Sequence, residues 1–129
     1  MGGDFKIEDR TTEMIIECII KVHQILGPGF LESVYRRALL LELKRMDLMA
    51  ETEKEFIIHY CGAVIGTHRL DLLVEKNVIV ELKTVDDLSR AHYAQVRSYL
   101  KATKLRVAIL VNFAKERADF RRIESPLIS

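Results

Sequence analysis

The sequence predicts an α/β domain in which a mixed β-sheet is flanked by helices. Apolar residues recur at three- and four-residue steps up to Met46 and then alternate with polar residues from Glu53 onward, which marks a change from helix to strand. A later amphipathic segment precedes a wholly apolar run, typical of a strand covered on both faces. The expected order is ααβββαββ. With 49% hydrophobic residues in a chain of 129, one ordinary core and a single domain over residues 1–129 are expected.

Two helices are expected first, over Asp9–Leu26 and Leu31–Met46. Gly27-Pro28-Gly29 ends the first one, because proline cannot continue the hydrogen-bond ladder and glycine accepts the terminal conformation. Each helix has one apolar stripe that we expect to face the core. The stripes are Met14, Ile15, Cys18, Ile19, Val22, Ile25 and Leu26 in the first helix, and Leu31, Val34, Tyr35, Ala38, Leu39 and Leu43 in the second.

The rest of the chain predicts five strands and one more helix. Three strands that alternate apolar with polar residues should form an antiparallel meander, and Ser89 is a candidate cap for the third helix, Ser89–Thr103. A strand buried on both faces and a short closing strand follow it. The expected strands are Glu53–Tyr60, Ala63–Val74, Val78–Val85, Leu105–Phe113 and Ala118–Ile123.

Composition excludes several classes of protein. The longest apolar runs, such as Val107–Val111, fall far short of the ~20 residues that a membrane-spanning helix needs. The first residues lack the basic start and apolar middle of a secretory signal, so a cytoplasmic protein is expected. Cys18 and Cys61 lie far apart and in no metal-ligand spacing, which predicts reduced thiols.

The net charge of +1 conceals a segregation of charge along the chain. Between Arg90 and Ile123 there are nine basic residues and two acidic ones, whereas the preceding residues have an acidic excess. A basic segment of this kind, Arg90 to Arg122, suits a polyanion such as nucleic acid. From charge alone, a solvated surface that is basic on one side is an equal alternative.

Three polar residues interrupt apolar strands of the expected meander. They are Asp71, Glu81 and Lys83, and the last two share one strand face because side chains alternate between faces. A two-residue loop at Lys76-Asn77 would point Asp71 away from Glu81. A three-residue loop over residues 75–77 would set Asp71 directly opposite Glu81. The longer loop is favoured, because it needs a left-handed residue at its end, which Asn77 tolerates.

In the favoured register, two carboxylates lie about 5 Å apart at Cβ across adjacent strands. A hard divalent cation such as Mg²⁺ or Mn²⁺ would relieve their repulsion, since both ions prefer carboxylate oxygens. Lys83 could then orient a water molecule or stabilise charge on a phosphate. The alternative is an ion pair between Lys83 and Asp71 or Glu81 on a solvated sheet face.

The spacing of these residues resembles the PD-(D/E)XK nuclease superfamily. Asp71, nine residues, Glu81, one residue and Lys83 lie on a hairpin between helices, and Gly29–Tyr35 reads as the name motif of the GxxExxY protein family within that superfamily. Further similarity to this family covers about residues 10 to 123. It lies in Tyr60-Cys61-Gly62, His68–Glu75, Val78–Lys83, His92, Gln95, Tyr99–Thr103 and Asn112-Phe113. Leu70 replaces the proline of the superfamily name, and His68 stands where the family has tyrosine.

The resemblance implies a restriction-endonuclease-like core and a metal-dependent nuclease acting on DNA or RNA. Asp71 and Glu81 would be ligands of Mg²⁺, with Mn²⁺ as a substitute, and Glu32 would be the additional acidic residue that completes the metal site. Lys83 would be the catalytic lysine. Gln95 and Tyr99 resemble the Q-x-x-x-Y element of RecB-like nucleases and share one helix face.

The alternative function is a non-catalytic module that binds nucleic acid or protein and retains the nuclease scaffold. The aromatic content of 7%, with no tryptophan, gives little sign of a surface for base stacking. A homo-oligomer is compatible with so small a domain, although no motif demands one.

Overall fold

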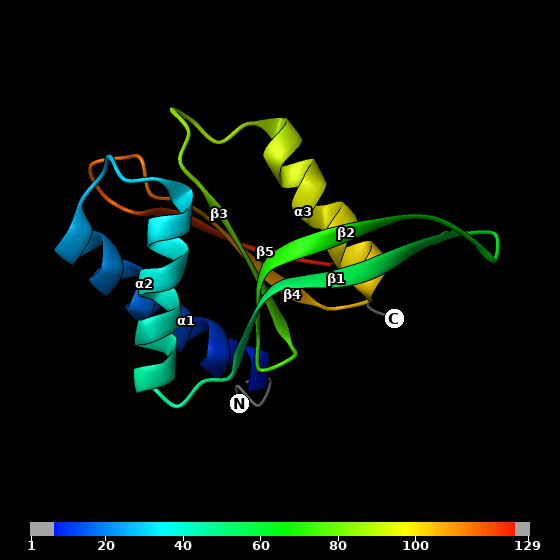
Figure 1. Cartoon of the computed structure of the whole chain (residues 1–129), viewed down its shortest axis with the longest axis horizontal. Coiled ribbons are helices and arrows are strands. Elements are labelled where there is room, and N and C mark those ends of the chain that lie inside the picture. The colour runs from blue at the N-terminus through cyan, green and yellow to red at the C-terminus, as the bar shows by residue number, and fades with distance from the viewer. Residues whose placement is uncertain (1–6, 126–129) are drawn as a thin grey trace, which may run out of the picture.

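The chain folds in the order that its sequence predicts, as a computed structural model of residues 7–125 shows (Figure 1). The helices are α1 (Ile7–Leu26), α2 (Glu32–Arg45) and α3 (Arg90–Thr103). The strands are β1 (Ala50–Tyr60), β2 (Ala63–Val74), β3 (Val78–Lys83), β4 (Val107–Asn112) and β5 (Asp119–Glu124). They form one sheet in the order β1-β2-β3-β4-β5. Only β3 and β4 pair in parallel, so the mixed sheet is confirmed.

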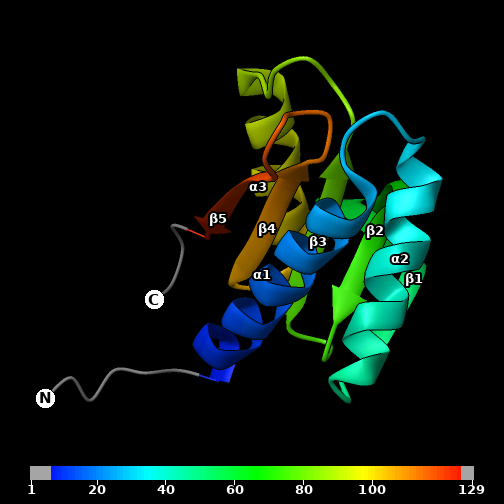
Figure 2. The ribbon, with the colours of Figure 1, turned by 90° about the vertical axis from the view of Figure 1, so that its left-hand side faces the viewer.

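Helices cover both faces of this sheet. Figure 2 shows α1 and α2 on one face and α3 on the other. Accordingly there are two clusters of buried apolar side chains, one beneath α1 and α2 and one beneath α3. All six residues of β4 are buried, which confirms the expectation of a strand covered on both faces.

The predicted apolar stripes are confirmed in the middle of α1 and α2. They are wrong at the C-terminal end of α1 and at the N-terminal end of α2. Ile15 and Leu39 are fully buried, whereas Ile25, Leu31 and Val34 are exposed. Leu31 is not helical but precedes α2 in an extended conformation. Ile25 lies at the end of α1, and Leu31 and Val34 lie just before and just inside the start of α2. Helical periodicity alone does not reveal where a helix passes the edge of its partner layer.

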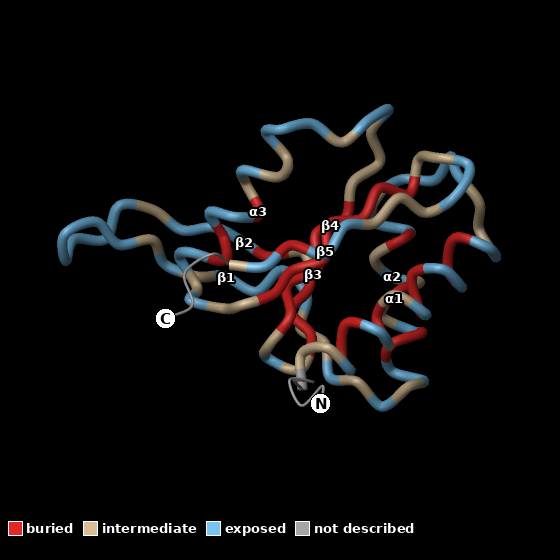
Figure 3. The backbone as a smooth tube through the Cα atoms, turned by 180° about the vertical axis from the view of Figure 1, so that it is seen from behind, coloured by how far each residue is buried: buried red, intermediate tan, exposed pale blue. Residues whose placement is uncertain are grey.

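The β1–β2 hairpin twists sharply at its root. Glu53 has a φ of +50° inside β1, between the pairs Thr52–Leu72 and Lys54–Leu70. On β2, Leu72 packs in the cluster beneath α1 and α2, whereas Leu70 packs in the cluster beneath α3. Asp71 therefore lies where the hairpin changes the layer to which it contributes. Beyond this point the hairpin packs against α3 through Leu70 and Phe56, and its outer half then extends away and is largely exposed (Figure 3).

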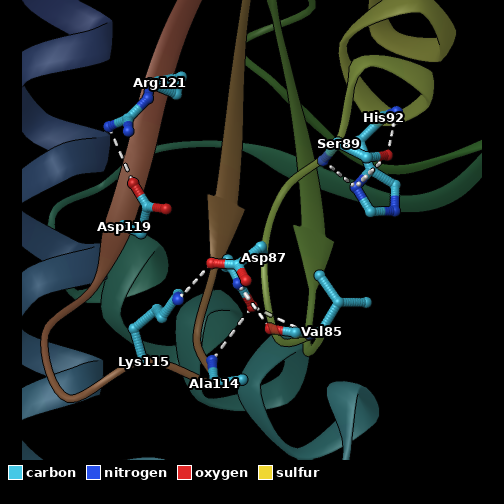
Figure 4. Close-up of polar contacts among 9 residues, drawn as sticks. Val85, Asp87, Ser89, His92, Ala114, Lys115, Asp119 and Arg121 are labelled. Atoms are coloured by element: carbon cyan, nitrogen blue, oxygen red, sulfur yellow. Dashed lines mark hydrogen bonds and ion pairs between the residues drawn. The ribbon is translucent and has the colours of Figure 1, made fainter.

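The loop after β3 is held by side chains rather than by strand pairing. Asn112, which is fully buried, accepts a hydrogen bond from the Val85 N–H at 3.1 Å and donates one to the Val85 carbonyl at 2.7 Å. For this reason β3 ends at Lys83, not at Val85 as predicted. Figure 4 shows Val85 beside Ala114, and Ser89 with His92 at the start of α3, where the expected Ser89 cap is confirmed.

Both thiols are unpaired, in agreement with the sequence. Cys61 is exposed at the hairpin turn, whereas Cys18 is buried, and burial raises its pKa to about 11. Within residues 7–125, no helix has the length and the apolar character that would let it cross a bilayer.

Candidate functional site

The candidate site lies where β2 and β3 separate. Their last backbone pair is Leu72 with Val80, and beyond it two side chains replace the ladder. The Asp71 N–H donates to Glu81 Oε1 at 3.0 Å, and the Leu82 N–H donates to Asp71 Oδ2 at 2.9 Å. Because buried backbone donors need acceptors, these reciprocal bonds satisfy the two strands as they separate. They also fix both carboxyl groups at one place.

This geometry confirms the three-residue loop and corrects the reason for it. Val74 pairs with Val78, so residues 75–77 form the turn and the two carboxyl groups approach each other. However, the left-handed residues are Glu75 and Lys76, with φ of 54° and 58°, and Asn77 does not have a positive φ. The Asn77 N–H instead closes the turn by donating to the Val74 carbonyl at 3.0 Å.

The electrostatics of the site are those of acids held close together. Burial raises the pKa of Glu81 to about 8, and the negative charge of Asp71 contributes to the shift. The pKa of Glu32 is also raised, first by burial and then by Asp71, while Lys83 acts in the opposite direction. The ionised forms of Glu81 and Glu32 are therefore disfavoured until a cation is supplied. Glu32, Asp71, Glu81 and Lys83 share one electrostatic environment.

Glu32 reaches this place because a buried tyrosine anchors the start of α2. The Tyr35 hydroxyl donates to the Gly27 carbonyl at 2.5 Å and accepts from the Phe30 N–H at 3.2 Å. Its ring is fully buried and stacks on Phe113, with centroids 4.5 Å apart. The loop also needs Gly29, whose φ is +111°. The glycine and the tyrosine of the Gly29–Tyr35 segment thus shape and hold the turn that presents Glu32.

Helix α3 brings the remaining candidates to the same side. Lys83 Nζ donates to Gln95 Oε1 at 3.3 Å. One turn later, Tyr99 is 5% exposed, and its pKa is raised by burial and then by the charges of Glu81 and Asp71. The structure therefore brings together all six predicted residues, which come from α2, β2, β3 and α3. His92 is not among them, because it caps α3 through the Ser89 N–H at 2.9 Å.

Two charged residues beside the site escaped sequence analysis. Arg36 lies 4.0 Å from Glu32 and 3.8 Å from Glu53 on β1. The spacing of Glu32 and Arg36, one helical turn apart, is a detectable signal. The contribution of Glu53 had no such signal, because it depends on the left-handed backbone that turns β1 toward α2.

The acid pair suits a magnesium ion, because this ion does not need a closed cage of protein ligands. Asp71 Oδ2 and Glu81 Oε1 each accept a backbone N–H, which holds two carboxyl groups side by side. Within residues 7–125, no group of three His, Cys, Asp or Glu side chains is close enough to hold a metal ion by itself. Mg²⁺ typically binds one or two carboxylates and keeps water or substrate phosphate as its other ligands. The donor set therefore fits this ion.

The basic segment does not form one uniform patch. Lys115 pairs with Asp87 at 2.6 Å (Figure 4), Arg121 with Asp119 at 2.8 Å, and Arg122 with Asp9. On α3, Arg90, Arg97 and Lys101 recur at spacings of seven and four residues, so they share a stripe. At 3.6 residues per turn, that stripe lies roughly opposite Gln95 and Tyr99. The stripe of Arg90, Arg97 and Lys101, called the α3 stripe below, has no ion pair within the described residues.

Comparison with known proteins decides the family. A sequence profile described as the PD-(D/E)XK nuclease superfamily matches residues 9–123. The chain belongs to this superfamily. The superfamily is typically metal-dependent, in agreement with the donor set described above. No match was found among curated proteins.

Two solved structures have the same fold as this PD-(D/E)XK chain. The protein described as SSO0001 aligns with a TM-score of 0.59 and 26% identity, over 94% of this chain and 61% of its own. The present chain thus spans about three fifths of that protein's length. LHK-Exo, solved in complex with dAMP, aligns with a TM-score of 0.50 and 12% identity, over 88% of this chain and 82% of its own. At that identity the likeness concerns the fold alone.

Proposed function

We propose that this chain is a metal-dependent nuclease that hydrolyses phosphodiester bonds in DNA or RNA, and that it belongs to the GxxExxY branch of its superfamily. One observation carries the proposal: Asp71 and Glu81 are held together by reciprocal backbone bonds, with Lys83 on the same strand as Glu81. Two acids held together, one of them the buried Glu81, are costly unless a cation compensates them. The site residues are Glu32, Asp71, Glu81, Lys83, Gln95 and Tyr99.

Asp71 and Glu81 would hold Mg²⁺, with Glu32 as a further acidic group. When bound, such an ion would supply polarisation of the scissile phosphate and a lowered pKa for a water molecule. Lys83 donates to the attacking water or to a phosphate oxygen, where negative charge develops. Gln95 accepts a hydrogen bond from Lys83 Nζ and so directs the ammonium group. Tyr99 is buried and lies within the electrostatic influence of both acids.

The partner in this proposal is nucleic acid, bound in part through the basic segment Arg90 to Arg122. The α3 stripe supplies cations that no acidic residue among residues 7–125 neutralises. Since it lies away from Gln95 and Tyr99, it would hold phosphates that flank the scissile one. Such contacts are salt-dependent and largely independent of sequence.

A nuclease assay with a matched pair of lysine variants tests the proposal. Purified protein is incubated with single- and double-stranded DNA and RNA in Mg²⁺ or Mn²⁺. We expect Lys83→Ala to lower the cleavage rate by about 10²-fold or more, the typical scale for removing a positioned catalytic group. Lys76→Ala, in the exposed turn before β3, should cleave like the wild type. Equal loss in both variants, or cleavage by Lys83→Ala at the wild-type rate, contradicts the assignment.

Calorimetry with Mn²⁺ separates this proposal from the non-catalytic alternative. The wild type should bind Mn²⁺, and Asp71→Asn and Glu81→Gln should each weaken binding at least about tenfold, because each removes an anionic ligand. Glu55→Gln, an exposed acid on β1, is the control that should leave binding unchanged. A scaffold that has lost catalysis would give no binding that depends on Asp71 and Glu81.

A further inference from the structure

Three aromatic rings meet at the root of the β1–β2 hairpin, next to the acid pair. Tyr99 of α3 lies 5.6 Å from Phe56 of β1 and 5.3 Å from His68 of β2, between ring centroids. Phe56 and His68 are paired across the strands and stack, with centroids 6.0 Å apart. The three rings come from distant parts of the chain, so a low aromatic content does not prevent a local cluster. We call Phe56, His68 and Tyr99 the ring cluster.

The rings differ in how far they reach solvent. Tyr99 is buried and feels the charges of Glu81 and Asp71, Phe56 is half-buried, and His68 is exposed. The ring cluster therefore leads from the carboxylates to the surface. Tyr60, which is 67% exposed, ends β1 beyond the register shift between Ile58 and His59. It adds an exposed ring toward the end of the hairpin.

The outer part of this hairpin, residues 57–67, offers no cationic side chain of Lys or Arg with which to hold a phosphate. Residues 57–67 contain no Asp, Glu, Lys or Arg, in a chain with 30% charged residues. Its outer half nevertheless extends into solvent, with Ile57 and Val64 exposed (Figure 3). A surface that combines exposed rings with no charge suits nucleobases, whereas the cations of α3 suit the phosphates. The two chemical parts of a nucleic-acid strand thus have separate surfaces on opposite sides of α3.

We propose that the ring cluster, through the exposed ring of His68, is a stacking site for an unpaired nucleobase next to the phosphate held at Asp71 and Glu81. This inference rests on the proposed function and specifies its substrate. A base inside a duplex has both faces covered by neighbouring bases, whereas an unpaired base presents a free face to a ring. The site therefore favours a single strand or a frayed end over a blunt duplex, and Tyr60 extends it for a second base.

The test measures binding rather than cleavage, so that it does not depend on turnover. Lys83→Ala protein in Mg²⁺ is titrated with a fluorescein-labelled single-stranded oligonucleotide and with a blunt hairpin duplex of the same length. A second single strand that contains 2-aminopurine reports stacking by quenching of its fluorescence. Adding His68→Ala should weaken single-strand binding about tenfold and abolish much of the quenching, the scale expected for one base on one ring. Binding of the duplex should change by less than about twofold.

Two further substitutions distinguish a stacking role from a structural one. His68→Tyr retains a ring and should restore affinity and quenching. Thr67→Ala, exposed on the opposite strand face, should have no effect. Equal single-strand affinities of the His68→Ala and parent proteins overturn the inference, as does an equal loss for strand and duplex. Neither of these two results contradicts the proposed function, provided that the Lys83→Ala parent protein binds the strand or the duplex.

Two remaining outcomes also count against the inference. If the Lys83→Ala and the wild-type proteins bind no oligonucleotide at all, the proposed function fails and the stacking site fails with it. If sedimentation shows an oligomer that His68→Ala dissociates, the aromatic face is an interface between copies of this chain.

Tyr60→Ala should weaken binding less than His68→Ala, because Tyr60 lies farther along the strand from the acid pair.

Discussion

The acid pair and the basic segment differ in how the fold treats charge. Asp71 and Glu81 have acidic side chains of the same sign, Glu81 is buried, and each carboxyl group accepts a hydrogen bond from a backbone N–H of the other strand. In the basic segment, Arg121 and Arg122 are exposed and matched by acids, and the α3 stripe faces solvent. Buried like charges store an electrostatic cost, whereas exposed charges of either sign are screened. Two carboxylates therefore carry more functional information than a segment with seven excess positive charges.

The largest expected effect is the pH dependence that Glu81 gives to the metal-free protein. Its pKa of about 8 in the folded protein exceeds the 4.5 of an exposed glutamate, so the folded state binds this proton more tightly. The resulting stabilisation is complete below pH 4.5 and is lost as the pH rises to about 8. In EDTA, the unfolding free energy of the wild type relative to Glu81→Gln should fall by a few kcal/mol between about pH 5 and about pH 9.

Urea denaturation at several pH values measures this difference. The matched control is Glu55→Gln, since Glu55 is exposed and its partner Arg69 lies 3.2 Å away on the hairpin. Its curve should run parallel to that of the wild type across the range. Parallel curves for Glu81→Gln as well would contradict the raised pKa and the close approach of the two acids.

A smaller effect should follow from removing the acceptor that Asp71 provides for β3. Asp71→Ala leaves the buried Leu82 N–H without its partner, at a cost of about 1–3 kcal/mol, whereas Asp71→Asn keeps an acceptor oxygen. Both substitutions relieve repulsion with Glu81, so the difference between them isolates the hydrogen bond. It is measured by urea denaturation in EDTA at neutral pH.

The same pair of substitutions at an exposed aspartate, Asp87, provides the comparison. Asp87 makes an exposed ion pair with Lys115, so Asp87→Ala and Asp87→Asn should differ by less than about 1 kcal/mol. If the two pairs of variants gave the same difference, the bond between Asp71 and Leu82 would contribute no more than a surface contact.

Much of the fold was predictable because local patterns determine it. The change of period separated helices from strands, and the length of one turn set Asp71 beside Glu81. The predicted register is correct although Asn77 is not the left-handed residue of the turn. Register depends on the number of residues in the turn, not on which of them has a positive φ. The acid and lysine candidates could be found because a charged residue inside an apolar strand is visible without any knowledge of tertiary structure.

The parts that could not be predicted depend on contacts between distant segments. Phe56, His68 and Tyr99 meet only because the hairpin twists at Glu53 and α3 lies across its root. Likewise, Val85 leaves β3 because Asn112, 27 residues later, captures its backbone. The hydrophobic periodicity of the sequence does not predict such contacts between distant segments.

The smallest expected effect concerns the α3 stripe, and it tests whether exposed charge in this chain has a function. Each phosphate contact adds about 0.7 to the slope of log affinity against log salt for a single strand. Arg97→Ala and Lys101→Ala should each lower this slope by about that amount and weaken binding a few-fold. Because the stripe lies opposite Gln95 and Tyr99, the cleavage rate at saturating substrate should not change.

Arg122→Ala provides the contrast, since Arg122 is already paired with Asp9 and lies near Glu124. Its slope should remain close to that of the wild type, because a cation neutralised within the protein releases few counterions from the nucleic acid. Fluorescence anisotropy at a series of salt concentrations measures all three variants. An unchanged slope for Arg97→Ala would mean that the basic excess of residues 90–123 is a property of the surface rather than of the substrate interface.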